Sequence, residues 1–483
     1  MLPGPRGESL MQPIQGRIPT RLALFHGMGS IAYGVKDNGF STFLLLYYNQ
    51  VLGMSAQLVS LALMLALVID GIIDPIIGYL SDRTHTRWGR RLPWLYIAAI
   101  PLGISWYLMW SETTQPTFWG LVGLAVAVRA LVSCCEVPSV ALVPELTRDY
   151  DERTRLMRFR FLFGWGGGLF VMFLAYDVFL AKGLLDAEGY RAYGLTGAFM
   201  ITGAVLISAI AQHKVASGYP PRHRSKFSLA TAFSELRESF SHRAFVILLL
   251  GGGLAYTSQG ITFSISNYLY LFIWQFTPQD LGLFPFVLFA SVVTTFLLLP
   301  HLHKRWGKRD TAVFAALTGA AFWTSPFLLH AADLWPQVGT PQSTWPLFTL
   351  FFLSNVFNVS AMISASSMVA DVVEASEERT GRRSEGAFFA GNMFMTKCAT
   401  GLGIFTTGQL LAFAEMPEKA RPGQVPEAVL DTLSLTYAMA VVIFAVCVAL
   451  VLRRFPITRA DHEARLAALA AARANPDAEG MHP

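Results

Sequence analysis

Long stretches almost free of charge constrain the fold of this chain more than any other feature. Hydrophobic residues make up 53% of its 483 residues and charged residues only 14%, whereas an average soluble domain is about 25% charged. About twelve stretches reach the roughly 20 apolar residues with which an α-helix crosses a bilayer. They lie near residues 22–48, 54–80, 92–111, 117–143, 159–181, 192–212, 244–274, 280–300, 311–331, 346–370, 387–413 and 431–452. We therefore predict an all-α membrane protein with about twelve transmembrane helices.

The basic residues predict the orientation of these spans. If both termini are cytoplasmic, and Arg160 at the start of the fifth span is counted with the loop before it, 30 of the 37 Lys and Arg residues fall on the cytoplasmic side, 4 on the opposite side and 3 inside spans. This bias follows the positive-inside rule. It also accounts for a pI near 9.0 without nucleic acid, because basic loops would face anionic lipid. The first twenty residues lack the apolar core of a cleavable signal peptide, so we expect the first span to act as an uncleaved signal-anchor. We also expect a multi-pass protein of a bacterial inner membrane.

A polar segment near the middle predicts two halves. Residues 214–243 form the longest polar stretch between spans and contain Ser-Gly-Tyr-Pro-Pro, a linker pattern. Basic Arg-Trp-Gly turns at 87–91 and 305–309 repeat at matching positions of the two halves, as in two bundles related by an axis along the membrane normal. The predicted organisation is a tail (1–21), a six-helix bundle (22–213), a linker (214–243), a second six-helix bundle (244–452) and a tail (453–483).

Two acidic residues lie deep inside the second span. Asp70 and Asp74 are separated by one helical turn, so both carboxylates lie on one face. A charge at that depth costs at least about 2.5 kcal/mol on insertion scales, and two neighbouring carboxylates resist joint ionisation unless a cation lies between them. This arrangement suits a transporter. The alternative is that the pair only balances Arg129 or Lys397.

The charges inside the spans nearly balance. The deep acidic residues exceed the basic ones by one, which would suit a single bound monovalent cation, and counting Asp177 nearer the end of its span would make the excess two. The residues counted are Asp37, Asp70, Asp74 and Glu136 against Lys36, Arg129 and Lys397.

Several stretches together resemble one family of membrane proteins. Asp70-Gly-Ile-Ile-Asp74-Pro, the loop 86–94, the pair Lys36-Asp37, the stretch 136–155 and the stretch 368–397 match its motifs in order. They resemble the glycoside–pentoside–hexuronide:cation symporters, the melibiose-permease group of the major facilitator superfamily. The resemblance implies the major facilitator fold, with two six-helix bundles.

The resemblance also implies roles for individual residues. It places the cation at Asp70, Asp74 and Glu136, with a hydroxyl from Ser133, and Lys397 beside this site. The substrate-facing positions that it implies are Lys36, Asp37 and Arg160, with Asn392 as a polar neighbour. Arg129, on the face of Glu136, is a charge partner that could be structural or could contact substrate.

Charged residues near the expected cytoplasmic ends of spans form a second group. Asp82 is predicted to hold one conformation closed through a charge relay between helices. The basic residues of the same loop either anchor the topology or belong to this cytoplasmic gate, and a matching group follows the tenth span. The residues are Arg83, Arg87, Arg90 and Arg91 in the first group and Asp371, Arg382 and Arg383 in the second.

Four positions depart from the melibiose-permease pattern. Ile73 stands where that permease has an amide, and Val140, Met362 and Leu44 stand where aromatic rings are expected. Since sugar rings lie well against aromatic faces, the predicted pocket is not a melibiose pocket. It would take a larger, less polar glycoside or a molecule that is not a sugar.

These observations predict cation-coupled symport of a sugar or glycoside by alternating access. The alternatives are a lysolipid-like or other amphiphilic substrate and, more remotely, a membrane sensor that does not transport. Carboxylate oxygens suit Na⁺, whereas the loss of the amide at Ile73 and the apolar surroundings suit H⁺, so both coupling ions stay open. The sequence shows no catalytic constellation, so we expect neither an enzyme nor a cofactor other than the coupling cation. We also expect no obligate protein partner.

Overall fold

The computed structural model describes residues 16–111, 116–147, 149–216, 243–380 and 385–456, without the side chains of 150, 370, 371, 373–380 and 385–390. In these ranges the chain is helical apart from turns and one isolated β-bridge between Thr86 and Gly89. Nine helices in this part of the chain are long and apolar enough to cross a membrane.

The helices of the first half begin with a segment broken into short pieces. These pieces are α1 (Thr20–Met28), α2 (Ile31–Asn38), the π-helical η1 (Gly39–Phe43), α3 (Leu44–Leu46) and the π-helical η2 (Tyr47–Val51). The longer helices that follow are α4 (Ala56–Arg83), α5 (Leu92–Met109), α6 (Phe118–Leu146), α7 (Tyr150–Leu174) with η3 (Ala175–Phe179), and α8 (Ala187–Ala216).

The second half contains five long helices. They are α10 (Arg243–Tyr268) with η4 (Leu269–Ile273), α11 (Pro278–Ala331), α12 (Pro341–Thr380), α13 (Glu385–Phe413) and α14 (Glu427–Leu452). Non-helical backbone at Gly307 divides α11 into two stretches, which correspond to the eighth and ninth expected spans. With the broken segment Thr20–Val51 and α13, every expected span has a helical counterpart, so the predicted all-α membrane fold is confirmed.

The repeated Arg-Trp-Gly turns have a shared backbone geometry. Gly89 has φ of 82° and Gly307 has φ of 75°, a left-handed conformation that glycine adopts at little cost. Each glycine therefore turns the chain sharply between two helices. The repeat seen in the sequence thus reflects the same local backbone requirement in both halves.

Short polar side chains start three of the spanning helices. The Ser55 hydroxyl accepts a hydrogen bond from the Leu58 N–H, the Thr117 hydroxyl does so from Gly120, and the Asp149 carboxylate does so from Glu152. These caps satisfy N–H groups that the first helical turn leaves without partners. They explain why α4, α6 and α7 begin where they do.

The chain forms two compact units that do not follow the two halves of the sequence. Unit 1 comprises residues 1–227, 260–285 and 400–433, and unit 2 comprises 228–259, 286–399 and 434–483. The C-terminal portions of α10 and α13, with the first residues of α11 and α14, therefore belong with the first half. The division into an N-terminal and a C-terminal bundle stays a prediction.

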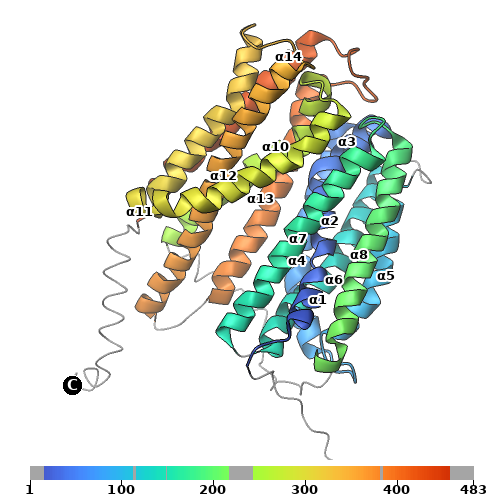
Figure 1. The fold of residues 1–483 in the computed structure, drawn as a ribbon, viewed down its shortest axis with the longest axis vertical. Coiled ribbons are helices and arrows are strands. Elements are labelled where there is room, and N and C mark those ends of the chain that lie inside the picture. Colours follow the sequence, from blue (N-terminus) through green and yellow to red (C-terminus); the bar gives the residue numbers. More distant parts are fainter. Residues whose placement is uncertain (1–15, 112–115, 148, 217–242, 381–384, 457–483) are drawn as a thin grey trace, which may run out of the picture. The chain divides into compact units, whose positions relative to one another are not determined.

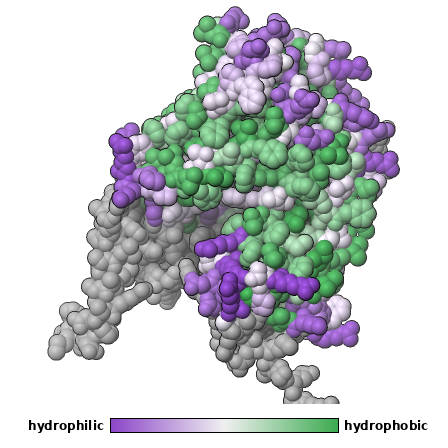
Figure 2. Space-filling view, viewed as in Figure 1, coloured by the Kyte–Doolittle hydropathy of each residue, from purple (hydrophilic) through white to green (hydrophobic). Residues whose placement is uncertain are grey.

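Unit 1 is built on helices that run alongside one another. α4 and α5 both pack on α6, α5 also packs on α8, and α7 packs on α1 and α2 (Figure 1). Hydrophobic side chains cover much of the visible helix faces, with hydrophilic ones gathered toward helix ends (Figure 2). Apolar outer faces of this kind fit helices that face lipid.

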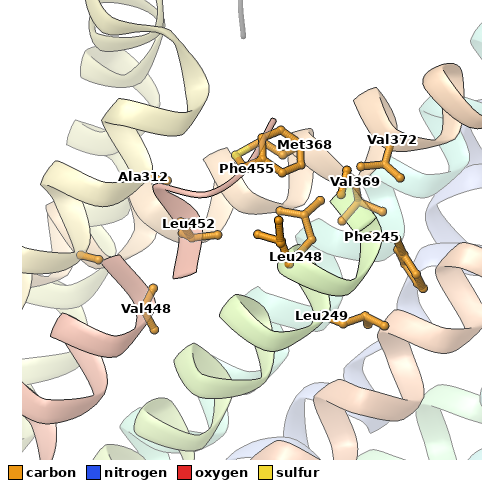
Figure 3. Packing of buried hydrophobic residues seen from close by; sticks show 13 residues of the cluster. Phe245, Leu248, Leu249, Ala312, Met368, Val369, Val372, Val448, Leu452 and Phe455 are labelled. Carbon is orange, nitrogen blue, oxygen red and sulfur yellow. The ribbon is translucent and has the colours of Figure 1, made fainter. Parts of the chain in front are cut away.

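Unit 2 has its own apolar core. Phe245, Leu248 and Leu249 of α10 pack beside Met368, Val369 and Val372 of α12, together with Ala312 of α11 and Val448 and Leu452 of α14 (Figure 3).

Candidate functional site

The intramembrane acidic residues lie where α4 packs on α6. Asp70 and Asp74 share one face of α4, and Arg129, Ser133 and Glu136 follow one another along α6. Because helical residues three and four apart lie on the same face, the close packing of the two helices brings these groups together. The sequence pattern predicted both faces, and the structure pairs them.

Ser133 joins the two aspartates. Its Oγ lies 2.9 Å from Asp70 Oδ1 and 2.6 Å from Asp74 Oδ1. Asp70 Oδ2 also lies 3.1 Å from Nη1 of Arg129, and Asp70 is only 3% exposed. This ion pair matches the structural role considered for Asp70, and it leaves open a second role in binding a cation.

The three oxygens carry a chemical constraint. A serine hydroxyl has one proton to donate, so it cannot donate to two carboxylates at once. With both carboxylates ionised, the second short contact would bring two electron-rich oxygens together. A proton on one carboxyl, or a cation held among the three oxygens, would relieve that repulsion. Two carboxylate oxygens and a hydroxyl are donors that a hard cation prefers.

Glu136 lies half-buried one turn beyond Ser133, within electrostatic range of Lys36 and Tyr33. Among the described residues, no three Asp, Glu, His or Cys side chains converge closely enough to hold a metal ion. The predicted grouping of Glu136 with both aspartates is therefore not a closed carboxylate cage in this structure. Its membership of the cation site stays a prediction.

Lys36 and Arg160 are buried basic residues at positions that the sequence predicts to face the substrate. Lys36 is buried on α2, and its Nζ lies 2.5 Å from Oδ1 of the exposed Asp37. Arg160 is buried on α7, donates from Nη1 to Ser139 Oγ at 2.6 Å, and lies over the Tyr33 ring. Ser139 and Glu136 lie on neighbouring turns of α6. The residue that contacts Arg160 therefore lies on the same helix as Ser133, which contacts the two aspartates.

Two other expected site residues lie on α13. Asn392 and Lys397 are half-buried there, and both belong to unit 2. Their expected roles beside the substrate and the cation therefore stay predictions.

The loop after α4 forms an ion-pair network at the end of unit 1. Arg91 contacts Asp82 and donates from Nη1 to Ser81 Oγ at 2.6 Å. Arg90 and Arg91 also donate from Nε to Oε1 of Glu145, at 2.8 and 3.3 Å. These bonds join the loop to α6. Arg90 and Arg91 thus serve at least to fix the loop, while their role in a gate is untested.

The remaining predicted gate residues divide into two groups. Arg83 lies over the Tyr79 ring at 4.2 Å and Arg87 over the neighbouring Trp88 ring at 5.5 Å, as expected for basic residues at a membrane interface. The Asp371 side chain, Arg382 and Arg383 lie outside the described residues.

The four departures from the melibiose-permease pattern differ in environment. Val140 is 41% exposed on α6, one turn beyond Glu136, whereas Leu44 is fully buried. Ile73 and Met362 are half-buried. Val140 thus exposes an aliphatic side chain one helical turn from Glu136, where an aromatic ring was expected.

Sequence reasoning missed Glu145 and Ser139. Glu145 directly follows Pro144 at the end of the fourth span. A charged residue is ordinary at a membrane surface, so its presence there did not indicate a functional site. Ser139 is a small polar residue among many in apolar helices. Its spacing of three residues from Glu136 was the only available signal that the two share a face.

Comparisons with known proteins place most of the chain in one family. The family model described as MFS/sugar transport protein matches residues 25–459. An uncharacterized symporter of Synechocystis, sll1374, is 28% identical, and the match covers 92% of this chain and 95% of the relative. The putative glycoside/cation symporter YagG of Escherichia coli is 25% identical, covering 91% of this chain and 92% of the relative.

A more distant relative and a solved structure complete the comparison. The sodium-dependent lysophosphatidylcholine symporter 1 of Gallus gallus is 23% identical, covering 81% of this chain and 78% of the relative. The crystal structure of a mutant of the nucleoside transporter NupG matches with a TM-score of 0.65 at 13% identity, covering 89% of this chain and 99% of that chain, which shows the shared fold. The chain therefore belongs to the MFS/sugar transport proteins, the glycoside–pentoside–hexuronide:cation symporters within the major facilitator superfamily.

Proposed function

We propose that this protein couples the uptake of a glycoside to a cation, Na⁺ or H⁺, bound between Asp70, Asp74 and Ser133. The observation that carries this proposal is the single hydroxyl at hydrogen-bond distance from two carboxylates. Membership of a symporter family supports a transported ion rather than a fixed one. A bound cation would offset the repulsion among the two carboxylate oxygens and the hydroxyl oxygen.

The charges around the site support one monovalent cation. Arg129 is a basic group at hydrogen-bond distance from Asp70, so it offsets one of the two aspartates. Burying an uncompensated charge is costly, so the loaded site would close more readily than the empty one.

The substrate would bind at the polar groups beyond Glu136. The Lys36–Asp37 pair and the Arg160–Ser139 pair offer donors and acceptors for sugar hydroxyls. The bound cation would raise the affinity for the substrate, and the bound substrate would raise the affinity for the cation by the same factor. Rocking of two bundles around a filled site would carry both across.

A lysolipid-like amphiphile is a second candidate substrate. The open Val140 in place of an aromatic ring removes a surface on which a sugar ring would stack and leaves an aliphatic one. The named substrate of the Gallus gallus relative is a lysophospholipid, which supports the same alternative. We further propose a bacterial inner-membrane location with both termini cytoplasmic, from the distribution of basic residues.

Uptake into proteoliposomes tests the proposal. A panel of glycosides and lysolipids is offered under an imposed Na⁺ gradient, an imposed proton gradient, or neither. We expect one gradient to drive accumulation of at least one compound, and the effective gradient identifies the coupling ion. If neither gradient changes the uptake of any compound that binds, cation coupling is excluded.

Asp74→Asn tests the cation site within the same assay. We expect it to abolish gradient-driven accumulation while membrane insertion persists, because Asp70 still pairs with Arg129. Glu188→Gln is the control, since it removes an exposed carboxylate whose nearest basic partner is 3.9 Å away at Lys182. Normal accumulation by Asp74→Asn would remove this residue from the cation site.

A further inference from the structure

Arg129 is a buried basic residue between the candidate cation site and the first span. It lies on α6, one turn before Ser133. Its Nη1 is 3.1 Å from Asp70 Oδ2, while the Ser133 hydroxyl contacts the other oxygen of the same carboxylate. A cation bound between Ser133 and the two aspartates would therefore share Asp70 with this guanidinium.

The guanidinium also lies over an aromatic ring of the first span. Arg129 Cζ is 4.4 Å from the centroid of the Phe40 ring, and Phe40 is buried. The attraction between a cation and a ring face is strongest where water is excluded. Arg129 thus contacts α4 through Asp70 and the first span through Phe40.

One donor of the guanidinium is left over. Among the described residues, none accepts a hydrogen bond from Arg129 Nε, although this atom is buried. A buried donor without a partner costs free energy, so this position is not the most favourable one for the hydrogen bonding of the side chain. Arginine keeps its charge in proteins. The change open to Arg129 is therefore a displacement rather than the loss of a proton.

Phe40 is joined through the backbone to residues that are expected to face the substrate. It is the second residue of η1, and the N–H of Gly39 bonds to the carbonyl oxygens of Val35 and Lys36. Asp37 lies three positions before Phe40 and pairs with Lys36. A shift of the Phe40 ring would therefore reach the Lys36–Asp37 pair through a single turn of helix.

The turn that carries Phe40 has a rare geometry and is supported on one side. η1 is π-helical, and π-helical turns are rare but frequent at functional sites. A Cβ added at Gly39 would overlap the Trp106 ring of α5, and the Phe40 and Trp106 ring centroids are 6.4 Å apart. Trp106 therefore blocks movement of this turn toward α5, so a displacement of Phe40 would run along the side that Arg129 occupies.

Charge at Asp70 also acts on Lys36 through space. Lys36 lies within electrostatic range of Arg129 and Asp70, as well as of Asp37 and Glu136. Such interactions are stronger inside a protein than in water. A cation that arrives at Asp70 would repel both basic side chains. The same event would thus affect the first span through the Phe40 contact and through the electric field.

We propose that Arg129 and Phe40 form a coupling link, by which cation occupancy at Asp70 repositions the Lys36–Asp37 pair for the substrate. This inference rests on the cation site of the proposed function. The coupling cation and the guanidinium are like charges that share one carboxylate, so a bound cation weakens the attraction of Asp70 for Arg129. The guanidinium then shifts, and the ring beneath it follows. Arg129 is thus a positioning residue for the substrate rather than a ligand of it.

A spin label beside Phe40 tests the coupling link without any substrate. Ser41→Cys places a thiol at a half-buried position of η1, in a background in which the four native cysteines are replaced. The thiol carries a nitroxide, and the protein is studied in nanodiscs with Na⁺, with choline, and with choline at mildly acid pH. We expect Na⁺ or acid to change the ratio of two label populations at least about fivefold, the lower end for coupling between two sites.

Three variants separate the coupling link from general packing. Phe40→Leu keeps a buried apolar side chain but removes the ring, so the population ratio should become nearly independent of the cation. Phe43→Leu is the matched control, because Phe43 is buried in the same turn and packs on tyrosine rings, and it should keep the parental response. Arg129→Lys keeps a positive charge but loses the guanidinium that covers the ring. It should also lose the response, and it decides the question even if Phe40→Leu does not fold.

Cation binding is measured separately, as the rise in the thermal unfolding midpoint that the cation causes beyond the rise seen in Asp74→Asn. The coupling link is refuted if the cation raises this midpoint without changing the label populations. It is also refuted if Phe40→Leu keeps the parental response or if Phe43→Leu loses it. A parent protein whose midpoint responds to neither cation would instead overturn the proposed cation site, and the coupling link with it.

Discussion

Ser133→Ala should weaken cation binding far more than substrate binding. The substitution removes the one hydroxyl that lies 2.9 Å from Asp70 and 2.6 Å from Asp74. A hydrogen bond to a charged group contributes about 1.5–3 kcal/mol. We take the lower end, because the removed oxygen leaves room for a water that can replace part of the bond. The concentration of cation at half-maximal uptake should therefore rise about tenfold.

The assay is initial-rate uptake in proteoliposomes as a function of cation concentration and, separately, of substrate concentration. Ser139→Ala is the matched control, because it removes from the same helix a hydroxyl that contacts Arg160 at 2.6 Å and Tyr33. For Ser139→Ala we expect the substrate KM to rise at saturating cation, with a much smaller change in cation dependence. The two serines thus separate the two binding functions along α6.

Two results would refute this reasoning. If Ser133→Ala keeps the parental cation dependence, the cation does not contact the oxygens that this hydroxyl joins. If both variants shift cation dependence equally, the effect comes from α6 packing rather than from a ligand. In either case the shared hydroxyl would no longer support the proposed site.

Two further predictions concern the ion pairs of unit 1. Asp70→Asn should lower the thermal unfolding midpoint in detergent strongly, since it leaves the buried Arg129 without its counter-ion at a cost of about 3–5 kcal/mol. Adding Arg129→Met should restore much of that midpoint, and no recovery in the double variant would contradict the pairing. Glu145→Gln should also lower the midpoint, because Arg90 and Arg91 lose a shared carboxylate, while cation-dependent uptake stays parental. A changed cation dependence would show instead that this network is coupled to the site.

The fold could be predicted from the sequence because the bilayer imposes a simple length requirement. A helix satisfies its own backbone hydrogen bonds in lipid, so each apolar stretch of sufficient length had one available structure. The exceptions were local. The first span is broken into short α- and π-helical pieces between Thr20 and Val51, and no periodicity in its apolar residues distinguishes them.

The candidate site could be predicted only in part. The acidic residues were found because charge is rare and costly inside a span, and their spacing put Asp70 and Asp74 on one face. Glu145 and Ser139 were missed, since a surface carboxylate and a small hydroxyl carry no such signal. The buried amides of Asn49, Gln50 and Asn267 were missed for the same reason, because they are uncharged.

The sequence by itself determined which segments enter the membrane, because that depends on the hydrophobicity and length of each segment alone. It also determined which charges must be balanced within those segments. Only the tertiary structure decided the partners, since these depend on which helices pack together. It placed Arg129 on Asp70, put one Ser133 hydroxyl between two carboxylates, and joined Gln50 to a loop some 370 residues away.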